Sequence, residues 1–190
     1  HAIGDIAQAQ SLESIRKALF SEGDAQVKFA LITALGAIRS PDGVSILQQY
    51  IYDSDETVRL AAVKALVAVS HDSASEYLKL ALDDRSEPVR RMALLGLLEM
   101  GPAKHVSDFK KAMQWIGKRE LRHLVTLHKG AMIPHLKIAL DAERDDLREA
   151  ALDAVTLMSE PQRVNFYSEL ALKSRRSAMR VSGLQRLVDL

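Results

Sequence analysis

VRLAAVKALVAV, at residues 58–69, is apolar around most of a helix, yet its second residue is an arginine. Apolar or small residues occupy positions 1, 4, 5, 8, 9 and 12 of this segment, which is the spacing of one helical face. Position 6, Val63, is apolar as well, so the apolar arc is wider than a single face. We therefore expect a helix that packs against neighbours on more than one side.

Related segments recur along the chain at nearly constant intervals. They read VKFALITALGAI at 27–38, VRRMALLGLLEM at 89–100, LRHLVTLHKG at 121–130, LREAALDAVTLM at 147–158 and MRVSGLQRLVDL at 179–190. The segments that start at residues 27, 58 and 89 are separated by 31 residues each. The segment at 121–130 is degenerate and shortened. Such a period indicates a stack of supersecondary units.

An amphipathic stretch precedes each segment and would form the first helix of a pair. Pro41, Pro102 and Pro161 stand where first helices should start, a place that tolerates proline. The sequence thus predicts an all-α fold, a right-handed α-solenoid (α-α superhelix) of about six helix pairs with a degenerate fourth unit. We expect a single repeat domain over residues 1–190. The apolar final segment predicts more repeats, or a contact with another chain, beyond Leu190.

Two of the units resemble a known repeat family. DSDETVRLAAVKALVAV and DRSEPVRRMALLGLLEMG are similar to HEAT repeats, particularly the short bacterial HEAT-like repeats of phycobilisome-lyase-type proteins. The resemblance implies a scaffold whose second helices line a concave face. It also suggests, by repeat type alone, a chromophore-lyase subunit, although many non-lyases share the scaffold.

Composition narrows the class of protein. The chain has no cysteine, which excludes disulfides, thiolate metal sites and cysteine nucleophiles and fits a reducing compartment. No apolar run is long enough to span a membrane, and no signal-peptide pattern is present, so we expect a cytoplasmic location without membrane insertion. The chain begins at His1 without a methionine, and we expect it to be part of a longer protein.

Position 2 of the segment is basic in all six units: Lys28, Arg59, Arg90, Arg122, Arg148 and Arg180. The family resemblance implies that this cation pairs with an acid of the inter-helix turn and so builds a structural ladder. The acids expected for the ladder are Asp24, Asp55, Asp84 and Asp146. The alternative is a row of cations offered to an anionic partner. The turns before Arg122 and Arg180 lack an obvious acid, so these two are the best candidates for external anion contacts.

The expected concave face gives a candidate binding surface. Positions 3 and 7 of the second helices are the least core-like, and in the first four units they give Phe29, Leu60, Lys64, Arg91, Leu95 and His123. The apolar members would form a stripe with basic neighbours, suited to a helix or an extended segment of a partner protein. The alternative is that tight stacking buries these residues as additional core.

The degenerate fourth unit has an unusual composition. Residues 104–135 contain seven Lys or Arg, the only tryptophan and four histidines, at 105, 123, 128 and 135. Three interpretations are open: a metal site, an anion or nucleic-acid surface, or a broken repeat with incidental solvated histidines. His123 and His128 are five residues apart, which does not align them as metal ligands on a helix, and stacking aromatics are nearly absent.

No catalytic motif accompanies these features. The sequence contains no GxSxG, Walker A, GxGxxG or HExxH pattern. We therefore expect no enzyme and no cofactor, but a protein–protein interaction scaffold that binds another protein, or another domain of the parent chain, on its concave face. The alternative is a nucleic-acid-binding module that uses the basic C-terminal half, where residues 103–190 hold 16 bases against 11 acids.

Overall fold

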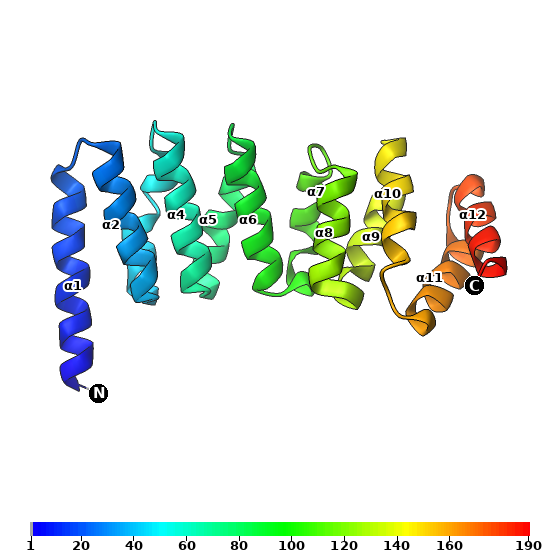
Figure 1. Cartoon of the computed structure of the whole chain (residues 1–190), viewed down its shortest axis with the longest axis horizontal. Helices are drawn as coiled ribbons and strands as arrows, with labels where there is room; N and C mark the ends of the chain where they lie inside the picture. Colours follow the sequence, from blue (N-terminus) through cyan, green and yellow to red (C-terminus); the bar gives the residue numbers. More distant parts are fainter. Residues whose placement is uncertain (1) are drawn as a thin grey trace. The chain divides into compact units, whose positions relative to one another are not determined.

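The computed structural model describes the backbone of residues 2–190 and the side chains of residues 8–190. It confirms the all-α solenoid: helix follows helix along the chain, and the described residues contain no strand (Figure 1). The chain falls into two compact units, one ending at Gly101 and the other beginning at Pro102. The single domain over residues 1–190 stays a prediction.

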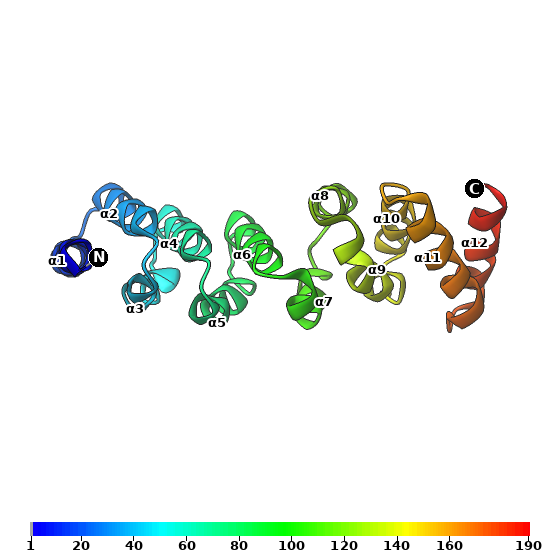
Figure 2. The same cartoon turned by 90° about the horizontal axis from the view of Figure 1, so that it is seen from below.

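The first unit consists of three helix pairs. Its second helices are α2 (Ala25–Ile38), α4 (Glu56–Val69) and α6 (Glu87–Glu99). Its first helices are α1 (Ala2–Ser21), the segment formed by η1 (Pro41–Gly43), α3 (Val44–Leu47) and η2 (Tyr50–Tyr52), and α5 (Asp72–Ala81). Helix α4 packs against both α2 and α6, so the second helices of this unit form one row, with α3 and α5 in the other (Figure 2).

The second unit also consists of three helix pairs, with shorter second helices. Its pairs are η3 (Pro102–His105) and α7 (Val106–Ala112) with α8 (Lys118–His128), then η4 (Lys129–Met132) and α9 (Ile133–Leu140) with α10 (Asp145–Val155), and last α11 (Glu160–Lys173) with α12 (Ser177–Val188). Helices α8 and α10 pack against each other in one row, and α7 and α9 in the other (Figure 2).

The wide apolar arc expected of the second helices is buried in four of the six helix pairs. The side chains at position 6 are at most 6% exposed in four units: Ile32, Val63, Leu94 and Leu152. Leu184 differs, since it is 57% exposed although it occupies the same position in α12. Among the described residues, no helix pair follows α12.

Small residues bring neighbouring second helices close together. A Cβ atom added to Gly36 of α2 would lie 2.8 Å from the Cβ atom of Ala65 in α4, which is closer than real Cβ atoms approach. Ala65 occupies position 8, where several units have a small residue. Ala34, also at position 8, is instead exposed, because no described second helix precedes α2.

None of the helices in the described part of the chain combines the length and the apolar character needed to cross a membrane.

Candidate functional site: the turn arginines and the second-helix surface

The arginine at position 2 holds the turn before its own helix. The Nη1 atom of Arg59 donates hydrogen bonds to the carbonyl oxygens of Asp53 and Ser54, at 2.9 and 3.1 Å. Arg90, Arg148 and Arg180 repeat this pattern on the carbonyls six and five residues before them. Each of these arginines is the fourth residue of its helix, from which a long side chain reaches back to the turn. The basic residue thus donates to backbone acceptors of the turn that have no partner within the helix.

The same side chain links neighbouring pairs in the first unit. Arg59 also binds the carboxylate of Asp84, in the next turn, with Nε–Oδ2 and Nη2–Oδ1 distances of 2.8 and 3.2 Å. Lys28 binds Asp53, which likewise lies in the next turn, with an Nζ–Oδ2 distance of 3.0 Å. A ladder therefore exists, and its acids lie 25 residues beyond the cations.

Asp24 and Asp55 were expected in this ladder and have a different role. Their side chains cap α2 and α4, because each Oδ1 accepts hydrogen bonds from backbone amides of the first helical turn. Asp146 does not take the expected place in the ladder either, since it binds Arg144 with an oxygen–nitrogen distance of 2.6 Å. Arg148 pairs with Asp145 of its own first turn.

The Lys28–Asp53 pair affects the protonation of both groups. The hydrogen bond to Asp53 raises the pKa of Lys28. Burial alone would raise the pKa of Asp53, but the Asp55 amide and the Lys28 ammonium outweigh burial and hold this pKa below its usual range. Both shifts favour the charged pair, as expected for a structural contact.

Arg122 departs from the pattern because α8 begins one residue earlier in relation to its arginine. Gly117 is the N-cap of α8, so Arg122 is the fifth helical residue instead of the fourth. One residue rotates a side chain about 100° around a helix, away from the turn. Arg144 substitutes for it: its Nη1 donates to the carbonyls of Met113 and Ile116, at 3.0 and 2.9 Å. Within the described residues no hydrogen bond or ion pair holds the Arg122 guanidinium, whereas Arg180 is engaged with its turn.

The predicted binding surface lies on the second-helix rows. Phe29 is 44% exposed, Lys64 and Arg91 are exposed, and Leu60 and Leu95 are half-buried. These five residues share the row formed by α2, α4 and α6 in the first unit, and we call them the row patch. His123 is exposed on α8, in the second unit. Arg91 forms an ion pair with Glu87 at 2.8 Å.

Two of the four histidines of the fourth and fifth pairs are buried, which differs from the interpretation of incidental solvated histidines. His105 is buried and its Nδ1 lies 2.9 Å from Asp108 Oδ2. His135 is fully buried and packs edge-on to Phe109 at 5.0 Å between ring centroids. Burial lowers the pKa of His135 to about 4 and outweighs the opposing effect of the Ala131 backbone, while His128 lowers this pKa further. Among residues 8–190, no three side chains of the metal-binding types are placed to hold an ion.

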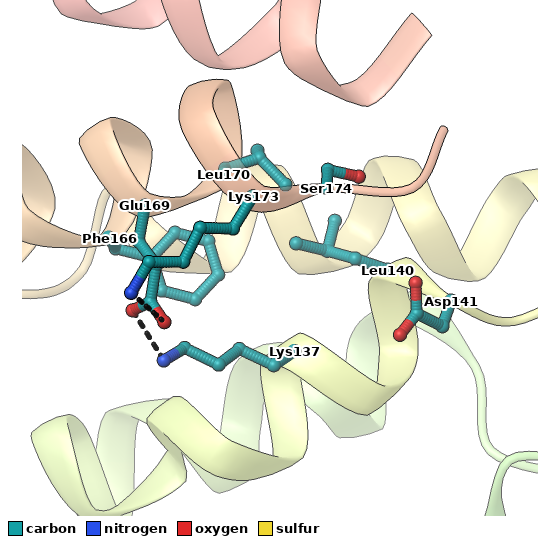
Figure 3. Close-up of a pocket in the computed structure, with 8 residues that line it drawn as sticks. All are labelled: Lys137, Leu140, Asp141, Phe166, Glu169, Leu170, Lys173 and Ser174. Carbon is teal, nitrogen blue, oxygen red and sulfur yellow. Dashed lines mark hydrogen bonds and ion pairs between the residues drawn. The ribbon is translucent and has the colours of Figure 1, made fainter. Parts of the chain in front are cut away.

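A cleft between α9 and α11 was not foreseen from the sequence. It encloses about 160 Å³, and Leu140, Phe166 and Leu170 form its apolar wall. At the rim of the cleft, Glu169 of α11 forms ion pairs with Lys137 of α9 at 2.6 Å and with Lys173 of its own helix at 3.8 Å (Figure 3). The ion pair with Lys137 is the main reason why the pKa of Glu169 is lowered. These residues come from helices about 30 positions apart in sequence, so no local pattern marks the cleft.

Comparison with known proteins identifies the repeat type. The HEAT-repeat family model matches residues 12–99. The structure of the complex of CpcE and CpcF of phycocyanin lyase from Nostoc sp. PCC7120 aligns with a TM-score of 0.55 at 18% identity, covering 89% of this chain and 73% of that chain. A designed armadillo repeat protein aligns at 18% identity with a TM-score of 0.41, covering 93% and 98%. No curated protein matches the sequence. The match to the HEAT-repeat family model is confined to residues 12–99, and the chain as a whole has the fold of an all-α solenoid.

Proposed function

We propose that the protein is a non-catalytic scaffold that binds a partner protein on the row patch of its first unit. The observation that carries this proposal is the exposure of Phe29, a large aromatic side chain that is 44% accessible on a second helix. The repeat fold is one that typically supplies a rigid surface for protein–protein interaction. The fold-related phycocyanin lyase structure is itself a complex of two subunits, which is consistent with a protein partner.

The spacing of the row patch indicates the kind of segment that it would bind. Leu60 and Lys64 are four residues apart on α4, and Arg91 and Leu95 are four residues apart on α6, so each pair shares one helical face. Since α2, α4 and α6 pack side by side, apolar contact area lies beside basic groups. An amphipathic helix with an acidic flank fits this combination, with its apolar residues against Phe29 and Leu60.

The proposal is tested with matched aromatic variants. We would compare Phe29→Ser with Tyr52→Ser, because Tyr52 is a 68% exposed aromatic on the first-helix row of the same unit. Partners captured by the wild-type protein are identified by mass spectrometry, purified, and titrated against each variant. We expect Phe29→Ser, and separately Lys64→Glu, to weaken the purified complex at least about tenfold while Tyr52→Ser leaves it unchanged. Equal binding by Phe29→Ser and wild type would refute the row patch as the site.

Nucleic-acid binding is the second candidate, and the state of Arg122 supports it. Arg122 is half-buried, its guanidinium has no partner in the described residues, and Arg119 and His123 are exposed on the same helix. If this function is correct, a labelled oligonucleotide would bind, and the affinity would fall steeply with added salt. Arg119→Gln and Arg122→Gln would then reduce binding while Phe29→Ser would not, and that result would replace our leading proposal.

A further inference from the structure

Each junction between interior helix pairs in the first unit has the same parts. Between α4 and α6, the earlier helix contributes a buried position 6, Val63, and an arginine, Arg59, that binds an acid of the following turn. The later helix contributes a small residue at position 8, Gly96, whose added Cβ would contact Val67. The acid, Asp84, lies two residues before the helix N-cap and also accepts a hydrogen bond from that residue's amide, at 2.7 Å.

Helix α12 carries the residues that the earlier helix contributes to such a junction, and they are exposed. Leu184 at position 6 is 57% exposed, and Val188, one turn further on, is 83% exposed. Arg180 holds its own turn through Nη1, but within the described part of the chain no acid binds its Nε and Nη2 atoms. In Arg59 these are the two atoms that bind the acid of the next turn.

Helix α2 and the turn before it carry the residues that the later helix and its turn contribute to such a junction. Ala30 and Ala34, at positions 4 and 8, are exposed, and Val27 at position 1 is 43% exposed. Glu22 lies two residues before the N-cap Asp24, which is the place of the ladder acids Asp53 and Asp84 in the other turns. Its Oε1 accepts from the Asp24 amide at 2.8 Å, as Asp53 accepts from the Asp55 amide at 2.9 Å. Glu22 forms no ion pair among the described residues.

We propose that α12 of one molecule docks on α2 of a second copy, so that the two ends form one more repeat junction. Leu184 would cover Ala30 and Ala34, and the guanidinium of Arg180 would bind the carboxylate of Glu22. The occupant is a second copy because this chain itself carries both complementary halves: among the described residues, a cation that no acid binds and an acid without an ion pair, and large apolar side chains with small ones to cover. The contact is head-to-tail, so each molecule uses each end once and assembly grows with concentration.

This geometry allows a stringent test with two variants of the whole chain. Leu184→Glu places a charge on the α12 face and leaves the α2 face intact, and Ala30→Glu does the reverse. Both residues are exposed, so circular dichroism should show unchanged helix content. Leu80→Glu, at a 51% exposed leucine on α5, is the matched control. Sedimentation velocity across a dilution series measures the association.

We expect the wild type and Leu80→Glu to form dimers and longer species as concentration rises. Each end variant alone should remain monomeric, and an equal mixture of the two should form a one-to-one dimer and stop there, because one intact junction remains. Glu22→Arg should weaken association at least about tenfold, since it sets two cations against each other. A monomeric wild type, association by an end variant alone, or a mixture that stays monomeric would each overturn the proposal. A following repeat or a different protein as the true occupant would give the monomeric wild type.

Discussion

The guanidinium of Arg59 and the carboxylate of Asp84 form a bidentate ion pair between successive turns, and the two side chains are only 4% and 9% exposed. The third nitrogen of Arg59 holds the carbonyls of its own turn. One side chain thus fixes the conformation of one turn and its distance to the next. This contact accounts for an arginine in an otherwise apolar helix.

Removal of Arg59 should be strongly destabilising. Arg59→Met leaves Asp84 buried without its cation and removes the Arg59 hydrogen bonds to the carbonyls of Asp53 and Ser54, so we expect a loss of about 3–5 kcal/mol in unfolding free energy. Urea denaturation measures this loss. Arg16→Met is the control, because Arg16 pairs with Glu13 on an exposed face of α1 and should give no measurable change. Similar midpoints for the two variants would show that the buried pair does not stabilise the fold.

Stability should fall as the solution becomes mildly acidic because of His135. Its pKa is about 4 when folded, whereas an unfolded histidine titrates near 6.5, so between these values the unfolded chain binds the extra proton. Unfolding free energy should therefore decrease by about 3 kcal/mol as the pH falls from 6.5 to 4. His135→Phe should remove this part of the dependence. Asp53, whose folded pKa is lowered, stabilises above its unfolded pKa and loses its contribution at more acidic pH, as the pH falls through its folded value.

The pH profile of the unfolding free energy, measured for wild type and His135→Phe, separates these contributions. An unchanged slope between pH 6.5 and 4 in the variant would mean that other groups cause the acid sensitivity.

Arg144 should hold the turn that precedes α8. Arg144→Ala frees the carbonyls of Met113 and Ile116, and we expect a loss of about 1–3 kcal/mol with faster amide exchange at the start of α8. Arg119→Ala is the matched control, because Arg119 is exposed in the first turn of α8. Equal exchange rates in the two variants would contradict a special role for Arg144.

Close packing of α2 on α4 should make Gly36 sensitive to a single methyl group. In Gly36→Ala the new Cβ would approach the Cβ and Cα atoms of Ala65 at 2.8 and 2.9 Å, so the backbone must move. We expect about 1–3 kcal/mol of destabilisation by thermal unfolding. The double variant Gly36→Ala, Ala65→Gly should be more stable than the single variant Gly36→Ala. Gly23→Ala, which meets nothing within 4 Å, controls for the loss of glycine itself.

Recognition of the repeat and prediction of the helix pairs needed no tertiary information. Both follow from local periodicity, because apolar residues three and four apart define a helical face and the 31-residue interval defines the unit. The helix-capping aspartates before α2 and α4 were visible as residues, but their role was misassigned, since a turn acid serves equally well in a cap or in an ion pair. The row patch residues were placed on second helices correctly, and their function stays a prediction.

By itself, the sequence determined the all-α repeat, the boundaries of most helix pairs and the presence of a basic residue beside every turn. Only the tertiary structure decided which acid each cation reaches. Lys28 and Arg59 bind acids 25 residues away because stacking brings successive turns within hydrogen-bonding distance. It also decided that Arg144 replaces Arg122, since a shift of one residue in the start of α8 rotates the latter away from its turn. Burial of His135 and the cleft between α9 and α11 likewise depend on contacts between elements distant in sequence, which local periodicity does not encode.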